Sequence, residues 1–372
     1  MPMFQLFFAL VVTIPNIYIF LRIRHLFISK KYRILYYLIY LLLVVMYPLN
    51  SLIIEKDFEL KYNVISIMAR YILPDYLYVI LLVLLFDIFL LINRLFKIVP
   101  RENFKSSQFR IAGLSVLVLV PLVVVIFGIN NFNTIRTTEY HVEVPKKASK
   151  IDHLKIAFAS DFHLKQRSDI HFVERFAAKI DSIHPDLLIF GGDVAEGNGE
   201  GEKMERIAKI FKGLHPRYGV YGVLGNHENL GSLDKGHFFD LAGIKMLCDS
   251  IAVMDGSFNL AGRMDNRYRD RITTAALLKS INDSLPVILI DHRPTDIIEN
   301  SRTTADIQLS GHTHNGQLFP FNFIISSIYE LGYGYKKIAN THFFVSSGIM
   351  LWGPPVRTIG KSEILVVDVE FK

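Results

Sequence analysis

The first 130 residues are dominated by long apolar runs, whereas the rest of the chain alternates short apolar and polar stretches. Four runs have the length of about 20 mostly apolar residues that a helix needs to cross a bilayer. They cover Met3 to Leu21, Ile34 to Ile54, Ile72 to Ile92 and Ile111 to Ile129. We therefore expect residues 1–130 to form a four-helix transmembrane region, followed by a linker over residues 131–150.

Residues 151–372 have the pattern of a globular α/β domain. Short apolar strands alternate with amphipathic stretches, and turns rich in Gly, Asn and Asp separate them. The expected strands cover Lys155 to Ser160, Asp186 to Phe190, Gly219 to Leu224, Lys245 to Leu247, Pro286 to Ile290, Ala305 to Leu309, His342 to Ser346 and Glu363 to Phe371. The expected helices cover residues 169–183, 202–213 and 273–281. The prediction is one α/β domain without internal repeats.

The composition also favours a membrane-associated chain. Hydrophobic residues make up 51% of the 372 residues, and the mean hydropathy is +0.31. Such a chain is more apolar than an average soluble protein. The first apolar run has neither a basic residue ahead of it nor a small-residue cleavage site, so we expect it to remain attached rather than to be removed as a signal peptide.

The distribution of charge indicates a membrane topology rather than a nucleic-acid partner. The net charge is +6, but residues 1–150 hold 17 Lys and Arg against 8 Asp and Glu, which leaves 24 against 27 for the rest. The basic excess therefore lies in the predicted membrane region. A nucleic-acid-binding surface would need a basic patch on the globular domain, and the sequence does not support one.

The loops between the apolar runs predict an orientation, because short cytoplasmic loops are enriched in Lys and Arg. Residues 22–33 contain five basic and no acidic residues, and residues 94–110 contain five basic residues against one acidic. Residues 55–70 contain three of each sign. We therefore expect a multi-pass protein of the bacterial inner (cytoplasmic) membrane, with the domain after residue 130 on the extracytoplasmic side.

Residues that can bind metals follow five of the expected strands, in the fragments "SDFH", "GGD", "GNHE", "DH" and "GHTHNGQ". Open α/β sheets usually bind ligands at the carboxyl ends of their strands. In an extended segment alternate side chains share a face, so His312 and His314 are expected to point the same way. Each fragment alone is explained as well by a polar turn or a core histidine. Five in order, jointly supplying Asp, His and Asn, favour one shared centre.

The residue types in these fragments fit a centre of two divalent ions. Asp and His without a thiolate suit Mn²⁺, Fe²⁺ or Zn²⁺, and we favour Mn²⁺. A pair of ions needs a shared ligand, for which a carboxylate is the natural choice. Such a pair stabilises both the attacking and the leaving oxygen of an in-line displacement at phosphorus.

The ordered fragments D-x-H, G-D, G-N-H-E, H and G-H-x-H resemble the signature of the calcineurin-like metallophosphoesterases, over roughly residues 151–372. The strings "LIDHRP", "SGHTHNGQ" and "WGPPVR" are similar to those of a membrane-associated bacterial branch. The resemblance implies a four-layer αββα sandwich and an enzyme that hydrolyses a phosphomonoester, phosphodiester or pyrophosphate.

The resemblance also implies roles for individual residues. The first metal would be held by Asp161, His163 and His314, the second by Asn226, His292 and His312, and Asp193 would bridge the two. His227 would act as the general acid for the leaving oxygen or stabilise charge in the transition state. Glu228 would orient its neighbours. Apart from the resemblance, Glu196 is a candidate to support the loop of Asp193.

Two further residues are candidates for substrate binding. Arg357 has a guanidinium group whose geometry matches phosphate oxygens, although a solvated surface arginine explains it equally well. Asn315 stands where related sequences often have Gly, so it would lie at the substrate rim.

Membrane helices attached to such a domain favour a lipid-linked or cell-envelope substrate over a free phosphorylated small molecule, although simple anchoring explains them too. Some relatives in the branch cleave UDP-2,3-diacylglucosamine in glycolipid synthesis, which is one alternative, but the expected topology argues against it. A non-enzymatic membrane receptor or scaffold that only binds a phosphorylated ligand is another. The complete ligand set argues against that class, and the oligomeric state stays open.

Overall fold

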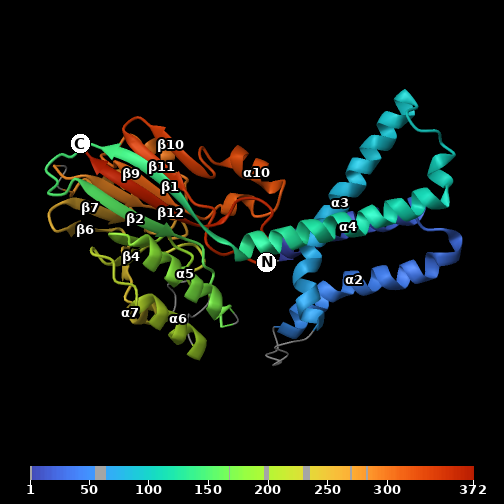
Figure 1. Ribbon diagram of the computed structural model, residues 1–372, viewed down its shortest axis with the longest axis horizontal. Helices are drawn as coiled ribbons and strands as arrows, with labels where there is room; N and C mark the ends of the chain where they lie inside the picture. The colour runs from blue at the N-terminus through green and yellow to red at the C-terminus, as the bar shows by residue number, and fades with distance from the viewer. Residues whose placement is uncertain are drawn as a thin grey trace. The chain divides into compact units, whose positions relative to one another are not determined.

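The computed structural model describes residues 2–54, 64–166, 168–196, 201–228, 235–268, 270–281 and 284–372 (Figure 1). The chain divides into two compact units. The first comprises Met1–Ile129 with Gly353–Val356, and the second comprises Asn130–Trp352 with Arg357–Lys372.

The first unit is helical. Its helices are α1 (Pro2–Leu26), α2 (Arg33–Ile54), α3 (Val64–Phe96) and α4 (Ser107–Asn133), with short 3-10 turns at η1 (Lys30–Tyr32) and η2 (Asn103–Lys105). Ile23 and Phe27 of α1 are buried in one cluster with Val83 of α3 and Leu117 of α4. A Cβ on Gly113 would lie 2.1 Å from the Phe27 ring. The missing side chain at Gly113 therefore lets α1 and α4 approach closely.

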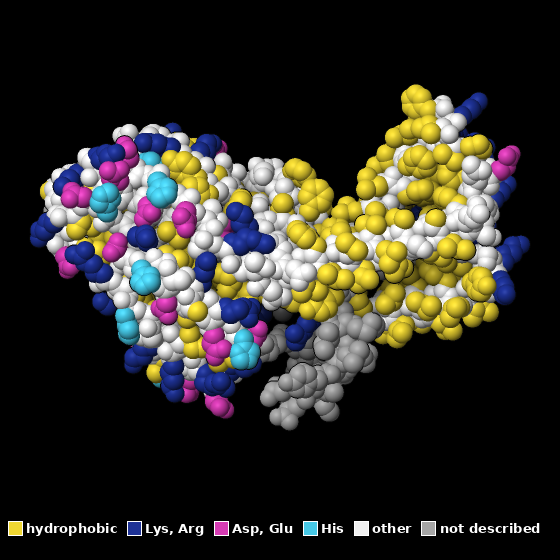
Figure 2. All heavy atoms as spheres, viewed as in Figure 1, with side chains coloured by type: hydrophobic (Ala, Val, Ile, Leu, Met, Phe, Trp, Pro, Cys, Tyr) yellow, Lys and Arg dark blue, Asp and Glu magenta, His cyan; other side chains and the backbone are white. Residues whose placement is uncertain are grey.

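The four long helices lie where the sequence predicts four spans. Among the residues whose side chains the structure describes, two helical segments are long and apolar enough to cross a bilayer, Arg70–Phe96 and Ser107–Asn133. Figure 2 shows hydrophobic side chains over much of the visible surface of this unit. On α4, Val118, Val123 and Phe127 are each more than half exposed. An apolar surface on helices of this length is typical of contact with lipid. The number of spans is not tested by these observations, so the four-span region stays a prediction.

The second unit contains two six-stranded mixed sheets in its described part, with the strand orders β1-β12-β2-β3-β4-β5 and β10-β11-β9-β8-β7-β6. The strands are β1 (Ile135–Val144), β2 (His153–Ala159), β3 (Leu187–Phe190), β4 (Val220–Gly222), β5 (Lys245–Met246), β6 (Ser250–Met254), β7 (Phe258–Gly262), β8 (Val287–Ile290), β9 (Ile307–Ser310), β10 (Gly334–Ile338), β11 (Thr341–Val345) and β12 (Ser362–Phe371). In the first sheet β2, β3 and β4 are parallel neighbours, and in the second β7, β8, β9 and β11 are. The α/β class predicted from the sequence is confirmed.

The two sheets bury one face of each against the other. Ile156 and Phe158 of β2 share a cluster with Leu260 of β7, Ile288 of β8 and Leu309 of β9. Strands that are buried on both faces need nearly continuous apolar runs, which explains sequences such as Leu187–Phe190 and Val287–Ile290. The sheets thus form a rigid sandwich whose strand ends carry the polar loops.

Helices cover the outer faces of the sandwich. The described helices of this unit are α5 (Ile170–Ile183), α6 (Glu202–Lys212), α7 (Lys235–Ala242), α8 (Thr274–Leu278), α9 (Ile297–Asn300) and α10 (Phe321–Ile328). The side chain of Asp169 caps α5 by accepting from the His171 N–H, and Phe172, Phe176 and Ile180 form its buried stripe. This stripe packs against the first sheet in a cluster that includes α6. The α8 residues Leu277 and Leu278 cover the second sheet.

Residues 131–150 were expected to form a linker, and they do not. They hold the end of α4 and strand β1, which pairs in parallel with β12 over its full length from Ile135 to Val144. Val142 and Val144 alternate with exposed Glu143 and reach the core between the sheets. The prediction missed this strand because most of its residues are polar, as is common where a strand lies at a sheet edge.

Candidate metal centre

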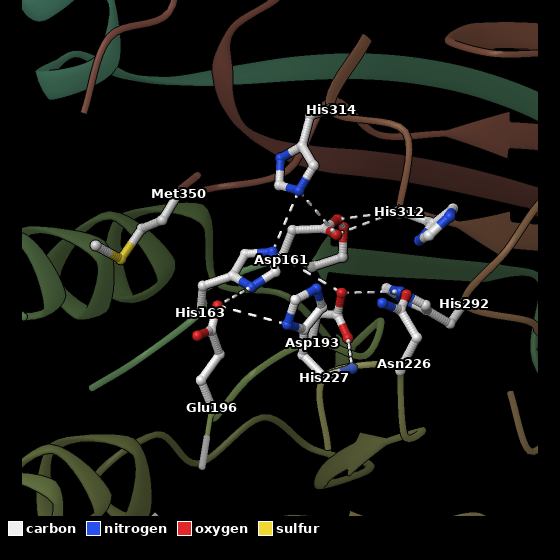
Figure 3. A network of polar contacts seen from close by, with 12 residues as sticks. Asp161, His163, Asp193, Glu196, Asn226, His227, His292, His312, His314 and Met350 are labelled. Atoms are coloured by element: carbon white, nitrogen blue, oxygen red, sulfur yellow. Dashed lines mark hydrogen bonds and ion pairs between the residues drawn. The ribbon is translucent and has the colours of Figure 1, made fainter. Parts of the chain in front are cut away.

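Eight side chains predicted to form the site converge at the carboxyl ends of five strands (Figure 3). Asp161 and His163 follow β2, Asp193 follows β3, Asn226 and His227 follow β4, His292 follows β8, and His312 and His314 follow β9. The first three strands belong to one sheet and the last two to the other. The site therefore lies where the loops of both sheets meet.

One cluster consists of Asp161, His163 and His314, whose ligand atoms all lie within 4.8 Å of one another. The Nε2 atoms of His163 and His314 are 3.2 Å apart, and His314 Nε2 lies 3.6 Å from Asp161 Oδ1. Side chains of Asp161 and His163 are buried. The two imidazole nitrogens and the carboxylate oxygen are all possible metal ligands. They lie close enough together to bind one cation.

A second cluster consists of Asp193, His292 and His312. The Nε2 atom of His292 lies 3.2 Å from Asp193 Oδ2, and the rings of His292 and His312 are 5.2 Å apart. Asn226 lies beside them (Figure 3), and within the described part of the chain its buried Oδ1 has no hydrogen-bond partner. An unsatisfied buried oxygen is costly unless something else binds it, which favours a cation at this place.

Asp193 lies between the two clusters. Its Oδ2 is 3.2 Å from His292 Nε2 on one side and 3.8 Å from His163 Nε2 on the other. Its Oδ1 accepts a hydrogen bond of 2.8 Å from the His227 backbone N–H. Of the described carboxylates, Asp193 is therefore the one that reaches both sets of imidazoles.

The backbone of the site is unusual. Asp161, His163, Asp193, His312 and His314 all have positive φ, between 48° and 72°. This left-handed conformation is unfavourable for residues with a Cβ, and clusters of such residues are found at functional sites. It also overturns one sequence argument: His312 and His314 are not on an extended strand sharing a face. They lie in the turn after β9, and each joins a different cluster.

Two glycines leave room for the ligands to approach. A Cβ on Gly192 would lie 2.6 Å from His292 Nδ1, and one on Gly311 would lie 2.5 Å from Asp161 Oδ2. Both contacts are closer than side chains tolerate. The glycines of "GGD" and "SGHTH" are thus explained by close packing around the ligands.

Hydrogen bonds orient two of the rings. His163 Nδ1 lies 2.8 Å from Glu196 Oε1, and His292 Nδ1 lies 2.8 Å from the Gly191 carbonyl oxygen. A carboxylate or carbonyl only accepts, so each Nδ1 carries a proton. In the neutral ring Nε2 then presents its lone pair to the cluster, which is the arrangement that metal-binding histidines generally have.

The electrostatics of the site favour positive charge at its centre. Burial would raise the pKa of Asp193, but His292 and His163 hold it well below its ordinary value. Burial likewise opposes protonation of His292, yet Asp193 and Asp161 raise its pKa to about 10. Burial and then the neighbouring His292 lower the pKa of His312 to about 3. The negative charge of Asp193 and Asp161 that stabilises a protonated His292 would also favour a bound cation, while His312 stays neutral and able to donate its lone pair.

Glu228 ties two of the ligand loops together. Its buried carboxylate accepts from the backbone N–H groups of Asp193 at 3.0 Å, Ala195 at 3.1 Å and Gly225 at 2.6 Å, and also from Val194. Burial raises its pKa to about 7 against the effect of these donors. Because the Glu228 carboxylate accepts four backbone hydrogen bonds, it positions the loops of Asp193 and Asn226 and does not itself contact a metal ion or a substrate.

His227 stands at the open side of the site. Its side chain is 29% exposed, whereas those of His163 and Asp193 are each 2% exposed. Its Nδ1 lies 3.6 Å from Glu196 Oε1, and its ring lies 6.2 Å from that of Trp352, which is 57% exposed. His163, Asp193 and His227 form a third group whose ligand atoms lie within 4.8 Å of one another, so the partly exposed His227 can reach either a metal ion or a bound substrate.

The two candidates for substrate binding, Arg357 and Asn315, lie in different surroundings. Arg357 is fully buried, and its guanidinium donates to the carbonyls of Ser347 at 2.7 Å, Gly348 at 3.2 Å and Met350 at 2.7 Å. The expected phosphate contact is therefore wrong: Arg357 holds the loop that packs behind Asp161. Asn315 is half-buried in the turn η3 (His314–Gly316), so its place at the substrate rim stays a prediction.

Sequence reasoning missed the loop after β7. Arg267 donates from its guanidinium to the Asn226 carbonyl at 2.5 Å, and the Tyr268 hydroxyl donates to the Glu228 carbonyl at 2.6 Å. Both contacts are made to the main chain of the G-N-H-E motif. No residue pattern announces such contacts, because any backbone carbonyl accepts in the same way.

The side chains present fit divalent cations. The donors are carboxylate, imidazole and one amide oxygen, with no thiolate among them, which suits Mn²⁺, Fe²⁺ or Zn²⁺. Asp161, His163 and His314 would hold one ion, Asn226, His292 and His312 the other, and Asp193 lies within reach of both.

Comparisons with known proteins identify the family of the second unit. The family model described as calcineurin-like phosphoesterase matches residues 154–316. An uncharacterized metallophosphoesterase of Campylobacter jejuni is 27% identical, over 99% of this chain and 98% of that protein. One from Aquifex aeolicus is 31% identical, over 64% of this chain and 93% of that protein. A zebrafish (Danio rerio) protein named transmembrane protein with metallophosphoesterase domain is 27% identical, over 77% of this chain and 70% of that protein.

Proposed function

Because this chain belongs to the calcineurin-like phosphoesterase family, a class of metal-dependent phosphoric ester hydrolases, we propose that it hydrolyses a phosphate ester or pyrophosphate at a two-metal centre. The observation that carries the proposal is the position of Asp193 between two clusters of ligand atoms, 3.2 Å from His292 and 3.8 Å from His163. One carboxylate shared by two sets of imidazoles is what a pair of ions requires.

Bound divalent ions would supply Lewis-acid charge for the phosphoryl oxygens and would lower the pKa of a water so that it can attack phosphorus. The chain's own residues prepare the site for this chemistry. Glu196 and Gly191 fix the rings of His163 and His292, and Glu228 fixes the two loops between them. His227, at the open side, faces the leaving oxygen and donates a proton or hydrogen bond to it.

We place this site next to a lipid bilayer. The support is the apolar helices, of which Arg70–Phe96 and Ser107–Asn133 have the length of spans, and the relatives whose names include a transmembrane protein. The preferred substrate class is accordingly a phosphate carried by a lipid or another component of the cell envelope. The intact ligand set favours an enzyme over a receptor that only binds phosphate.

A generic aryl phosphodiester tests the proposal. The purified full-length chain should hydrolyse bis(4-nitrophenyl) phosphate, and hydrolysis should stop when a chelator is added and return with Mn²⁺. Asp193→Asn should lower the metal content, measured by mass spectrometry of the elements, and abolish hydrolysis, because the clusters lose their shared anionic oxygen. Asp181→Asn, at an exposed position of α5, is the matched control. Full metal content and normal turnover in Asp193→Asn would reject the two-metal centre.

A further inference from the structure

Helix α10 (labelled in Figure 1) has an apolar surface that the domain does not cover. Its sequence, FNFIISSI, contains no charged residue. Phe323 is 64% exposed, Ile324 53% and Ile328 65%, and Phe321 and the preceding Phe319 are 41% and 45% exposed. These five residues make up half of the large exposed hydrophobic side chains in the described part of the second unit. A concentration of this kind on one short element marks an interaction surface.

The same helix borders the metal centre at both ends. It begins five residues after the turn of His314, and Tyr329, which follows it, lies 6.4 Å from the ring of His312. The Thr313 hydroxyl, between the two histidines, donates to the Gly332 carbonyl at 2.6 Å. Trp352, 57% exposed, adds a further apolar side chain beside His227. The apolar surface is therefore part of the rim around the site.

Hydrogen bonds within the second unit link α10 to the place where α4 enters it. Asn131, in the last turn of α4, donates to the carbonyls of Arg357 at 3.0 Å and Gly360 at 3.1 Å. The next residues of that segment bind the chain before α10: Thr358 N–H donates to the Gln317 carbonyl, and Phe319 N–H donates to Thr358 Oγ1 at 2.9 Å. The end of an apolar helix and the start of α10 thus flank one short segment, residues 357–360.

We propose that α10 is an interfacial helix, which inserts Phe321, Phe323, Ile324 and Ile328 into the bilayer surface beside the metal centre. The proposal rests on the membrane placement in the proposed function, since α4 brings the bilayer to residue 130. A helix with an apolar face lying in the interface buries that face about 5–10 Å into the headgroup and acyl boundary. Because α10 and the metal ligands of "GHTHNGQ" share one loop system, insertion would present headgroup phosphates to the site.

Depth-dependent fluorescence quenching tests the insertion on the full-length chain. In a Cys248→Ala background, Phe323→Cys or Ile328→Cys would be labelled with an environment-sensitive fluorophore and reconstituted into phosphatidylcholine–phosphatidylglycerol nanodiscs. Lipids carrying a nitroxide near the top of the acyl chain should quench both labels, on the order of twofold, and the emission should shift to the blue. Both positions are mostly exposed, and the ring contact that Phe323→Cys removes is with Phe319, itself 45% exposed.

The matched control is Val253→Cys. Val253 is 59% exposed on β6, which lies at the opposite edge of the second sheet from β10. It should show neither quenching nor a blue shift. Labels at Phe323 and Ile328 that behave like Val253 would overturn the proposal and leave the apolar face to a protein partner. The readout does not depend on hydrolysis, so strong quenching of an inactive enzyme would reject the proposed activity alone. A chain that fails to co-purify with nanodiscs would reject the membrane placement together with the insertion.

Discussion

His227 is half-buried beside the metal clusters and could serve either chemistry or metal binding, so the two roles are separated by experiment. His227→Ala should retain both metal ions and lose about 10²- to 10⁴-fold in the rate of aryl phosphodiester hydrolysis, the usual contribution of acid–base catalysis. Turnover and metal content would be measured on the same preparation. His171→Ala, at a position with a 76% exposed side chain, is the control and should change neither. If His227→Ala lost a metal and regained activity at high Mn²⁺, His227 would belong among the ligands.

Glu228 should act through the backbone of the ligand loops. In Glu228→Gln one carboxylate oxygen becomes an NH₂ group that faces two backbone N–H donors, so buried donors lose their acceptor. A buried unsatisfied donor costs about 1–3 kcal/mol. We expect a lower free energy of unfolding and weaker metal binding, measured by thermal unfolding with and without Mn²⁺.

The control for this substitution is Glu205→Gln, at an exposed position of α6, which should leave the unfolding midpoint nearly unchanged. Rescue by Glu228→Asp should be partial, because the shorter side chain keeps the charge but reaches fewer of the donors. Wild-type metal affinity in Glu228→Gln would show that Glu228 has no positioning role.

The site residues that could be predicted from the sequence are those whose side chains can bind a metal ion directly. Asp, Asn and His after five apolar strands were identifiable because few other roles demand that combination in that order. Arg357 was assigned wrongly and Arg267 was missed for one reason: both donate to main-chain carbonyls. Whether an arginine points to solvent or to carbonyls depends on how the loops pack, which the sequence pattern does not reveal.

At the scale of elements, apolar runs with clear turns were predictable, and the strands β2, β3, β8, β9, β11 and β12 lie close to their expected positions. Four of the described strands were missed. The edge strands β1, β6 and β10 mix polar and apolar residues, as is common where a strand faces solvent on one side, and the short central strand β7 contains Asn259 and Gly262. The helix α10 was missed as well, because with eight residues it is too short for its apolar pattern to distinguish a helix from a strand.

The end of α4 gives an element-scale prediction. Phe132 is 8% exposed and stacks on Phe172 of α5, with ring centroids 5.4 Å apart. Phe132→Ala should destabilise the second unit, which holds the metal centre and is called the catalytic unit below, by about 3–5 kcal/mol. This is the usual cost of removing a buried aromatic ring. For a domain of this size each kcal/mol lowers the unfolding midpoint by about 2–4 °C. Phe127→Ala, one to two turns earlier and 57% exposed, should have little effect. Equal midpoints for the two variants would contradict the anchoring of α4 in this core.

For the whole molecule, the distribution of charge and hydropathy along the chain predicts the membrane topology, which the motifs do not. The metal-ligand motifs are confined to the second unit and carry no information about sidedness. The loops at residues 22–33 and 94–110 hold five basic residues each, against three in residues 55–70 and three in residues 130–149 after the fourth span, which are Arg136, Lys146 and Lys147. This asymmetry predicts that the catalytic unit lies outside the cytoplasm. With four spans the N-terminus and the catalytic unit share one side, and the loss of any one span would reverse the side of the unit.

Thiol labelling in spheroplasts of a bacterial expression host decides the sidedness. Cys248 is the only cysteine and is exposed, so the background is Cys248→Ala. Single cysteines would be placed at Ser182, exposed at the end of α5, and at Ser107, exposed at the start of α4. A membrane-impermeant maleimide should label Ser182→Cys in intact spheroplasts and Ser107→Cys only after lysis. Labelling of both without lysis would mean that α4 does not span the bilayer. Labelling of Ser182→Cys only after lysis would place the catalytic unit in the cytoplasm, where a nucleotide-linked lipid becomes the leading substrate class.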